Sequence, residues 1–156
     1  KESIQCAKTI AWNILPKSIK NKIKKDWDDN GSWGLHIHTP DTATPKDGPS
    51  AGGAITLGIV SRLTGVPIKN TIATTGEIDL NGNIKKIGGL ISKILGGYKA
   101  GIKTVIIPKE NEHDYELIKK EGLMPKALKV ILIDHVKELI EKGLVGNDLE
   151  FNYDNI

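Results

Sequence analysis

The chain has 156 residues, of which 38% are hydrophobic and 26% are charged. This length and composition fit a single globular domain with a substantial core, and they exclude a disordered or fibrous chain. No apolar run approaches the roughly 18–20 residues that a membrane span needs, and the N-terminus carries no secretory signal pattern. We therefore expect no membrane partner. The first residue is Lys1 rather than Met, so we expect the chain to be part of a longer protein.

The net charge of +3 could favour an acidic partner, but the types of basic residue argue against nucleic acid. Only Arg62 among the 22 basic residues is an arginine, and the lysines are scattered along the chain. Recognition of phosphates and bases usually relies on the bidentate fork of arginine, so a nucleic-acid partner is not expected. The single cysteine, Cys6, lies in an amphipathic segment, where we expect a buried apolar side chain in a reducing compartment.

The first part of the chain predicts two helices and a strand. Apolar residues at helical spacing predict an amphipathic helix over residues 2–15, and the basic stretch 17–27 is also consistent with a helix. Residues 28–32, DDNGS, are typical of a turn. Over residues 33–40, apolar side chains alternate with histidines, which predicts a strand.

The rest of the chain alternates short helices and strands. A small-residue helix is predicted over 50–65, with Gly65 as its C-cap, and a hairpin over 71–87 because strand-like runs flank the turn NGN. The further predicted elements are a helix over 88–101, a strand over 103–108, a helix over 110–122, a strand over 128–134 and a helix over 135–143. The polar residues 147–156 predict a loose tail. This alternation predicts a mixed α/β or α+β domain.

The loop TPKDGPSAGG, residues 44–53, surrounds one serine with prolines and glycines, which hold backbone conformations that ordinary residues resist. This serine, Ser50, stands where the loop enters a predicted helix, and helix N-termini supply N–H groups and a positive dipole end. Three interpretations are open on these grounds: a helix N-cap, a phosphate cradle, and a mount for an acyl-transfer nucleophile. The pattern GxxxxGK[ST] of a phosphate-binding P-loop is absent from the sequence.

A serine nucleophile needs a general base, and histidine is the usual one. His36 and His38 precede the loop, but the alternation puts both on one face of the predicted strand, while His113 and His135 begin predicted helices and are weaker candidates. A lysine can serve if an apolar pocket keeps it neutral; lowering a lysine pKa from ~10.4 to ~7–8 disfavours its charge by about 4 kcal/mol. Lys93 has apolar neighbours, although a lysine on an amphipathic helix is more often a solvated charge.

Three blocks of this sequence resemble the proteolytic domain of Lon, the family of ATP-dependent serine proteases. The blocks are HIHTPDTATPKDGPSAGG, TTGEIDLNGNIKKIGGL and AGIKTVIIPKEN, in this order and spacing. The resemblance implies that Ser50, in PKDGPSAG, is the nucleophile. It also implies that Lys93, the last residue of GGLISK, is the base. In this block Ile91 and Ser92 replace the two residues that the family has before the lysine.

The resemblance also implies roles for residues beside this pair. Thr75, in TTGE, is expected to hydrogen-bond the lysine and orient it. Asp47, in PKDGPS, is expected to gate the site or to shape the oxyanion hole. Gly48 and Pro49 are expected to permit close approach of the substrate.

Three further residues match the family without a defined chemical role. His36 and His38 match a family block of the form HVHVP, which implies a supporting role. Glu77, in TTGE, is expected to form a structural salt bridge or hydrogen bond.

The resemblance implies a fold and domain boundaries as well. The fold is expected to be α+β (mixed α/β), of the ribosomal-protein-S5-domain-2 type, with short strands and packed helices. The proteolytic domain is expected to occupy residues 1–144, and residues 145–156 to form a polar C-terminal tail. The family's strand-rich segment ahead of the first helix is missing from this sequence, through trimming or through a naturally shortened domain.

The resemblance implies cleavage of unfolded or misfolded polypeptides through an acyl-enzyme intermediate. No cofactor or metal is expected in this chain; ATP and Mg are expected only for an upstream ATPase module. The implied partners are polypeptide substrates and further copies of the protein in a ring of six, in the cytoplasm or, alternatively, in the mitochondrial matrix. The competing hypothesis is a non-catalytic Lon-like scaffold or nucleic-acid-binding ring component. Such a protein would be expected to lose Ser50 or Lys93, and both are present.

Overall fold

The computed structural model describes residues 2–38 and 48–156. Its helices are α1 (Glu2–Ile14), α2 (Lys17–Asn30), α3 (Gly52–Thr64), α4 (Leu90–Lys99), α5 (Glu112–Lys120) and α6 (Val136–Gly143), with short 3₁₀ turns η1 (Pro49–Ala51) and η2 (Lys109–Asn111). Its strands are β1 (Ile72–Thr74), β2 (Glu77–Ile78), β3 (Ile84–Lys85), β4 (Thr104–Pro108) and β5 (Lys129–Ile133). Within these residues, no helix combines the length and the hydropathy that crossing a bilayer requires.

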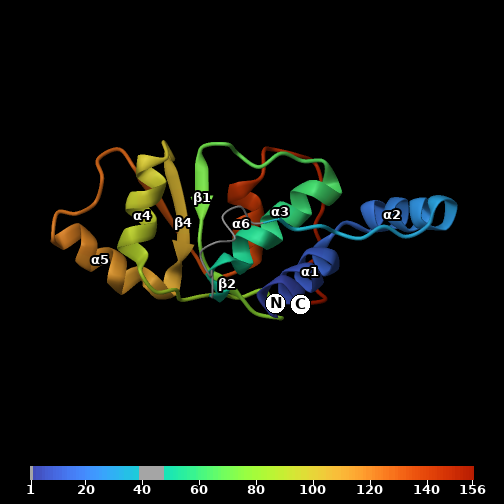
Figure 1. The fold of residues 1–156 in the computed structure, drawn as a ribbon, viewed down its shortest axis with the longest axis horizontal. Helices are drawn as coiled ribbons and strands as arrows, with labels where there is room; N and C mark the ends of the chain where they lie inside the picture. The colour runs from blue at the N-terminus through green and yellow to red at the C-terminus, as the bar shows by residue number, and fades with distance from the viewer. Residues whose placement is uncertain (1, 39–47) are drawn as a thin grey trace.

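A parallel sheet with the strand order β1–β4–β5 lies near the centre of the molecule (Figure 1). Parallel neighbours need a crossover connection, and α4 and α5 provide the two crossovers. The hairpin β2–β3 forms a separate antiparallel pair in which Glu77 lies opposite Lys85. The molecule is therefore an α+β domain, as the sequence predicts.

Strand β4 is buried on both faces because it lies between two layers of helices (Figure 1). Val105 and Ile107 pack into a cluster with Ile94 of α4 and Ile118 of α5. The residue between them, Ile106, packs into the other cluster, with side chains of α1, α3 and α6. Successive side chains of a strand point to opposite faces, so this one strand joins both parts of the core.

Helix α1 packs against α3 through the stripe that its sequence predicts. Ala7, Ile10, Ala11 and Ile14 recur at helical spacing, and all four are completely buried. The predicted helices over 17–27, 50–65, 88–101, 110–122 and 135–143 are also confirmed, as are the strands over 103–108 and 128–134. Gly65 ends α3 in the left-handed conformation, as predicted for a C-cap.

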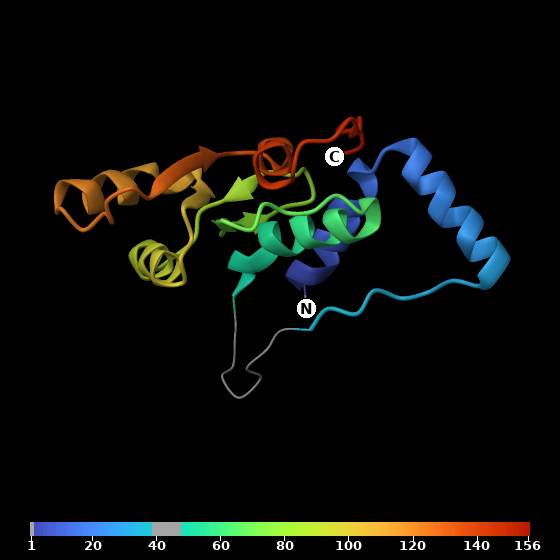
Figure 2. The ribbon, with the colours of Figure 1, turned by 90° about the horizontal axis from the view of Figure 1, so that it is seen from above.

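Helix α2 projects from the rest of the molecule (Figures 1 and 2). Ile23 is its one buried residue. An aromatic chain connects the helix to its surroundings: Trp27 stacks on Trp12 with ring centroids 5.7 Å apart and meets Trp33 edge-on at 5.8 Å.

The strand predicted over residues 33–40 is wrong for residues 33–38, which pair with no strand in the described part of the chain. Residues 39 and 40 lie outside it. The alternation of burial is nevertheless present: Leu35 and Ile37 are half-buried, while His36 and His38 are exposed. The two apolar residues pack beside α3. A helix therefore buries the apolar side of this segment, where the pattern predicted pairing within a sheet.

Two further expectations change. In the hairpin predicted over 71–87, only the residues around NGN pair with each other, because β1 joins the parallel sheet instead.

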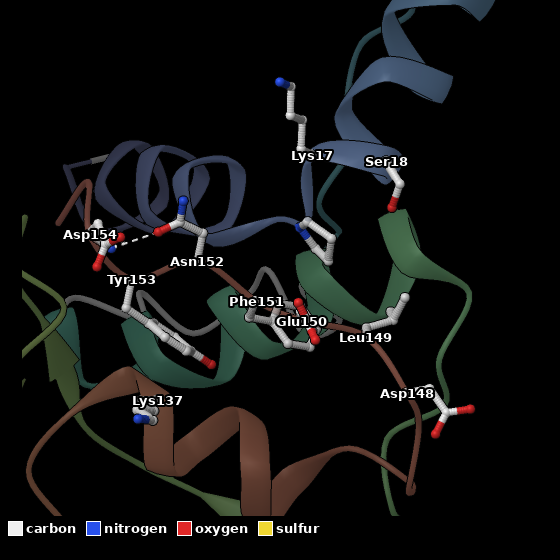
Figure 3. A pocket seen from close by; sticks show the side chains of 11 residues that line it. Lys17, Ser18, Lys137, Asp148, Leu149, Glu150, Phe151, Asn152, Tyr153 and Asp154 are labelled. Atoms are coloured by element: carbon white, nitrogen blue, oxygen red, sulfur yellow. Dashed lines mark hydrogen bonds between the residues drawn. The ribbon is translucent and has the colours of Figure 1, made fainter.

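The stretch 147–156 is not a loose tail. Figure 3 shows it running along α1 and α6, where the Asn152 N–H donates to the Ile14 carbonyl at 3.0 Å. Burial, helped by the nearby Glu141 carboxylate, raises the pKa of Tyr153 to about 12.

The segment that leads into α4 is fixed by a buried side chain, Asn111, which is inaccessible to solvent. Its Oδ1 accepts from the Ile87 N–H at 3.0 Å, and its Nδ2 donates to the Ile87 carbonyl at 2.9 Å and to Asp114 at 2.8 Å. One side chain thus satisfies both backbone groups of Ile87 and ties the start of α4 to the start of α5.

We predict that Asn111→Ala lowers the free energy of unfolding by about 2–4 kcal/mol, because it leaves two backbone groups and a carboxylate oxygen without their partner. The measurement is urea unfolding of the variant beside Glu121→Ala, an exposed change expected to stay within about 0.5 kcal/mol of wild type. Equal stability of the two variants would contradict the role of Asn111.

Candidate active site

Ser50 lies in the turn η1, immediately before α3. Pro49 starts this turn, where its fixed φ suits a helical first position and its missing N–H is not needed. The N-cap positions of η1 and α3 are Gly48 and Ala51, and no side chain caps either helix. The Ser50 hydroxyl is therefore not used as a helix cap, which removes one of the three interpretations of the loop.

The Ser50 carbonyl is held by two donors from the segment between β1 and β2. The Gly76 N–H donates to it at 2.9 Å, and the Thr75 hydroxyl donates to it at 3.3 Å. The Gly76 carbonyl in turn accepts from the Gly53 N–H at 3.0 Å. These three bonds attach the start of α3 to the end of β1 and fix the backbone from which the Ser50 side chain projects.

Two glycines make this close approach possible. A Cβ at Gly52 would lie 2.9 Å from Cγ2 of Ile78 and 3.1 Å from the Ile78 backbone nitrogen. Gly76 has a φ of +156°, and a Cβ there would lie 2.6 Å from Cγ2 of Ile84. A larger residue at Gly52 would push the start of α3 away from β2, and a larger residue at Gly76 would collide with the Ile84 side chain of β3.

Lys93 approaches Ser50 from the other side of the pocket. It lies in the first turn of α4, which begins after Gly89 in the left-handed conformation with a φ of +64°. The Lys93 Nζ donates to the Ser50 Oγ at 3.1 Å, across 43 positions of sequence. If the amine is neutral, the same contact can reverse, with the serine O–H donating to Nζ.

The pocket around this pair has a volume of about 360 Å³. Apolar and small residues form much of its lining: Ala54, Ala73, Gly96, Gly97 and Val105. The sequence predicts that such a pocket withdraws Lys93 from water, but Lys93 is exposed in this structure. The apolar lining lies beside the amine without covering it.

Among the other predicted site residues that lie in the described ranges, Thr75 is the one that lines the pocket. It is buried, with 8% of its surface exposed. The family resemblance implies a hydrogen bond from Thr75 to Lys93, but the Thr75 hydroxyl donates to the Ser50 carbonyl instead. Pro49 and Gly48 lie exposed next to the serine. Asp47 lies outside the described residues.

The histidines lie apart from the pocket. His36 lines a different groove, beside α3, and His38 follows it on the same extended segment. His135 has a structural role, because its Nδ1 accepts from the Lys137 N–H at 3.1 Å and caps α6. Glu77 is half-buried on β2, and within the described ranges it forms none of the ion pairs.

Sequence reasoning missed two features of the site. Gly76 organises the turn through both of its backbone groups, and its position inside TTGE was the available signal. Gly96 and Gly97 both line the pocket beside Lys93, although helix propensity marks glycines inside the predicted helix over 88–101 only as weak points. Over residues 2–38 and 48–156, no three His, Cys, Asp or Glu side chains are grouped so that they could hold a metal ion.

Known proteins have sequences similar to this one. The family model described as Lon protease (S16) C-terminal proteolytic domain matches residues 1–146, so the chain belongs to this family. It is 46% identical over 154 residues to the Lon protease homolog of Acanthamoeba polyphaga mimivirus, covering 97% of this chain and 15% of that protein. It is also 46% identical over 144 residues to the Lon protease of Buchnera aphidicola subsp. Baizongia pistaciae, covering 92% of this chain and 18% of the relative. It is 44% identical over 144 residues to the Lon protease of Haemophilus influenzae, covering 92% of this chain and 17% of that protein. The chain thus spans less than a fifth of the length of these relatives.

We predict that Gly52→Ala destabilises the protein by about 1–3 kcal/mol, because the added methyl collides with the Ile78 backbone. The matched control is Gly58→Ala in the same helix, where nothing lies within 4 Å of the added Cβ. This change should stabilise the protein by about 0.5–1 kcal/mol through its helix propensity. Urea unfolding measures both, and effects of the same sign would contradict the close contact at Gly52.

Proposed function

We propose that this chain is the serine endopeptidase domain of an ATP-dependent Lon-type protease, with Ser50 and Lys93 acting as a catalytic dyad. The observation that supports the dyad most directly is the 3.1 Å contact between the Lys93 Nζ and the Ser50 Oγ. Two groups so far apart in sequence meet only because η1 and α4 are each fixed by their own contacts.

In the proposed reaction, the Ser50 Oγ attacks a peptide carbonyl while its proton passes to the neutral Lys93 Nζ. Backbone N–H groups of the loop that carries Ser50 stabilise the negative oxygen of the tetrahedral intermediate. The C–N bond then breaks, and the departing amine takes the proton from the Lys93 ammonium. Water, deprotonated by the neutral Lys93 amine, then attacks the resulting ester. The bond between the acyl carbon and the Ser50 oxygen breaks, and the Lys93 ammonium returns the proton to that oxygen.

Because Lys93 is exposed, the bound substrate has to exclude water from the amine. A polypeptide laid over the pocket excludes water from a lining that is already rich in small apolar residues, and exclusion of water favours the neutral amine. Thr75 and Gly76 keep the serine backbone in place while this happens. Asp47 is proposed, from the family resemblance, to gate the site or shape its oxyanion hole.

The activity of the longer protein is part of the same proposal. Its substrates are unfolded or misfolded polypeptides, delivered by an ATPase module that binds ATP and Mg outside this chain. The relatives named Lon protease are more than five times as long as the part that this chain matches, which leaves ample room for such a module. We also propose a ring of six copies and a cytoplasmic location, with the mitochondrial matrix as the alternative.

The test is hydrolysis of a fluorogenic peptide and of an unfolded protein from about pH 6 to about pH 10. Ser50→Ala should reduce hydrolysis to background, and Lys93→Ala should reduce it by about a hundredfold to ten-thousandfold, the usual contribution of a general base. Wild-type hydrolysis should rise with pH, because only the neutral amine accepts the serine proton.

The matched control is Lys99→Ala, which removes an exposed lysine from the last turn of α4 and should leave hydrolysis unchanged. Hydrolysis that survives in Ser50→Ala would contradict the proposal. Equal losses of hydrolysis in Lys93→Ala and Lys99→Ala would also contradict it, because they would show that activity depends on the positive charge of α4 in general rather than on Lys93 as a base.

A further inference from the structure

A second groove borders the turn that carries Ser50. It has a volume of about 630 Å³ and lies between the first turns of α1, the residue Pro49 and the stretch from Glu77 to Leu80. Pro49 directly precedes Ser50, so this groove and the Ser50–Lys93 pocket both border η1, although no residue lines both.

The distance along a substrate favours use of this groove. Consecutive residues of an extended polypeptide lie about 3.3–3.6 Å apart. A chain with its scissile carbonyl at the Ser50 Oγ would therefore reach the neighbourhood of Pro49 within one or two residues.

The wall of the groove is apolar. Ile78 forms its buried part, and Leu80 is 63% exposed at its edge. The Cys6 thiol also lines the groove and donates to the Ile78 carbonyl at 3.2 Å. Burial is the main cause that raises the pKa of Cys6, and the nearby Asp79 and Glu2 carboxylates raise it further. The thiol therefore stays protonated and adds no charge to the groove.

The rim of the groove is negative, because Glu2, Glu77 and Asp79 all line it. In the ranges that the structure describes, none of the three belongs to an ion pair. Lys85, the cross-strand neighbour of Glu77, pairs with Glu110 instead, at 3.4 Å. A long aliphatic stem with a cationic head matches an apolar wall with a negative rim.

We infer that this groove is a substrate subsite that accepts a lysine or arginine side chain one or two residues from the scissile bond. The inference rests on the proposed peptidase function and adds a specificity to it.

The test uses fluorogenic peptides that carry Lys, Met or Glu at each of the two positions on either side of the cleavage site. At one position, kcat/KM should be about three- to tenfold higher for Lys than for Met, and lowest for Glu. The Lys-to-Met ratio should fall towards one in the Glu2→Gln, Glu77→Gln double variant and at about 0.5 M salt. Glu121→Gln, which removes an exposed carboxylate at the end of α5, should keep the wild-type ratio. The same peptides are also titrated onto Ser50→Ala by fluorescence anisotropy, which measures the subsite without chemistry.

The outcomes separate the two proposals. Ser50-dependent hydrolysis with a Lys-to-Met ratio near one at every position overturns the subsite and leaves the peptidase intact. A ratio that the double variant and Glu121→Gln change equally also overturns the subsite. If no peptide is hydrolysed but Ser50→Ala binds Lys peptides preferentially, the peptidase falls and the groove's basic preference stands. If neither hydrolysis nor preferential binding is found, both fall.

Discussion

The carbonyl of Ser50 is the constraint on which the rest of the site depends. Its two donors, the Gly76 N–H and the Thr75 hydroxyl, attach the entrance of α3 to the end of the edge strand β1. Because these bonds use the backbone of the serine, they fix the direction of its side chain and leave the hydroxyl itself available. Gly52 allows the next close approach, since a side chain there would collide with Ile78 of β2.

The partner amine is placed by an independent set of contacts. Asn111 holds the backbone of Ile87, and α4 begins a few residues later, after a left-handed Gly89. The first turn of α4 then brings Lys93 within 3.1 Å of Ser50. The site is thus a junction between two rigid supports, one on each side of β4, which is buried against both helix layers. The close packing of the interior holds the two supports, while the Lys93 side chain that joins them is exposed.

Much of this could be predicted from the sequence where the signal was local. Helical spacing gave α1, and NGN gave the turn between β2 and β3. The strand predicted over 33–40 was wrong for residues 33–38 because a local pattern does not identify the packing partner. The alternation at Leu35 and Ile37 indicates that one side of the segment is buried, but not that a helix buries it. The pairing of Ser50 with Lys93 was expected through family resemblance rather than from spacing. The bond from Thr75 to the Ser50 carbonyl, and the exposure of Lys93, depend on three-dimensional placement that neither pattern nor resemblance supplied.

Covalent labelling of Ser50 shows whether the Lys93 amine activates the Ser50 hydroxyl. The protein is treated with a fluorophosphonate or a peptidyl boronate, and mass spectrometry locates the adduct and follows its rate of formation. We expect an adduct on Ser50 that forms much more slowly in Lys93→Ala and at the wild-type rate in Lys99→Ala. An adduct on another serine, or a rate at Ser50 that does not depend on Lys93, would contradict it.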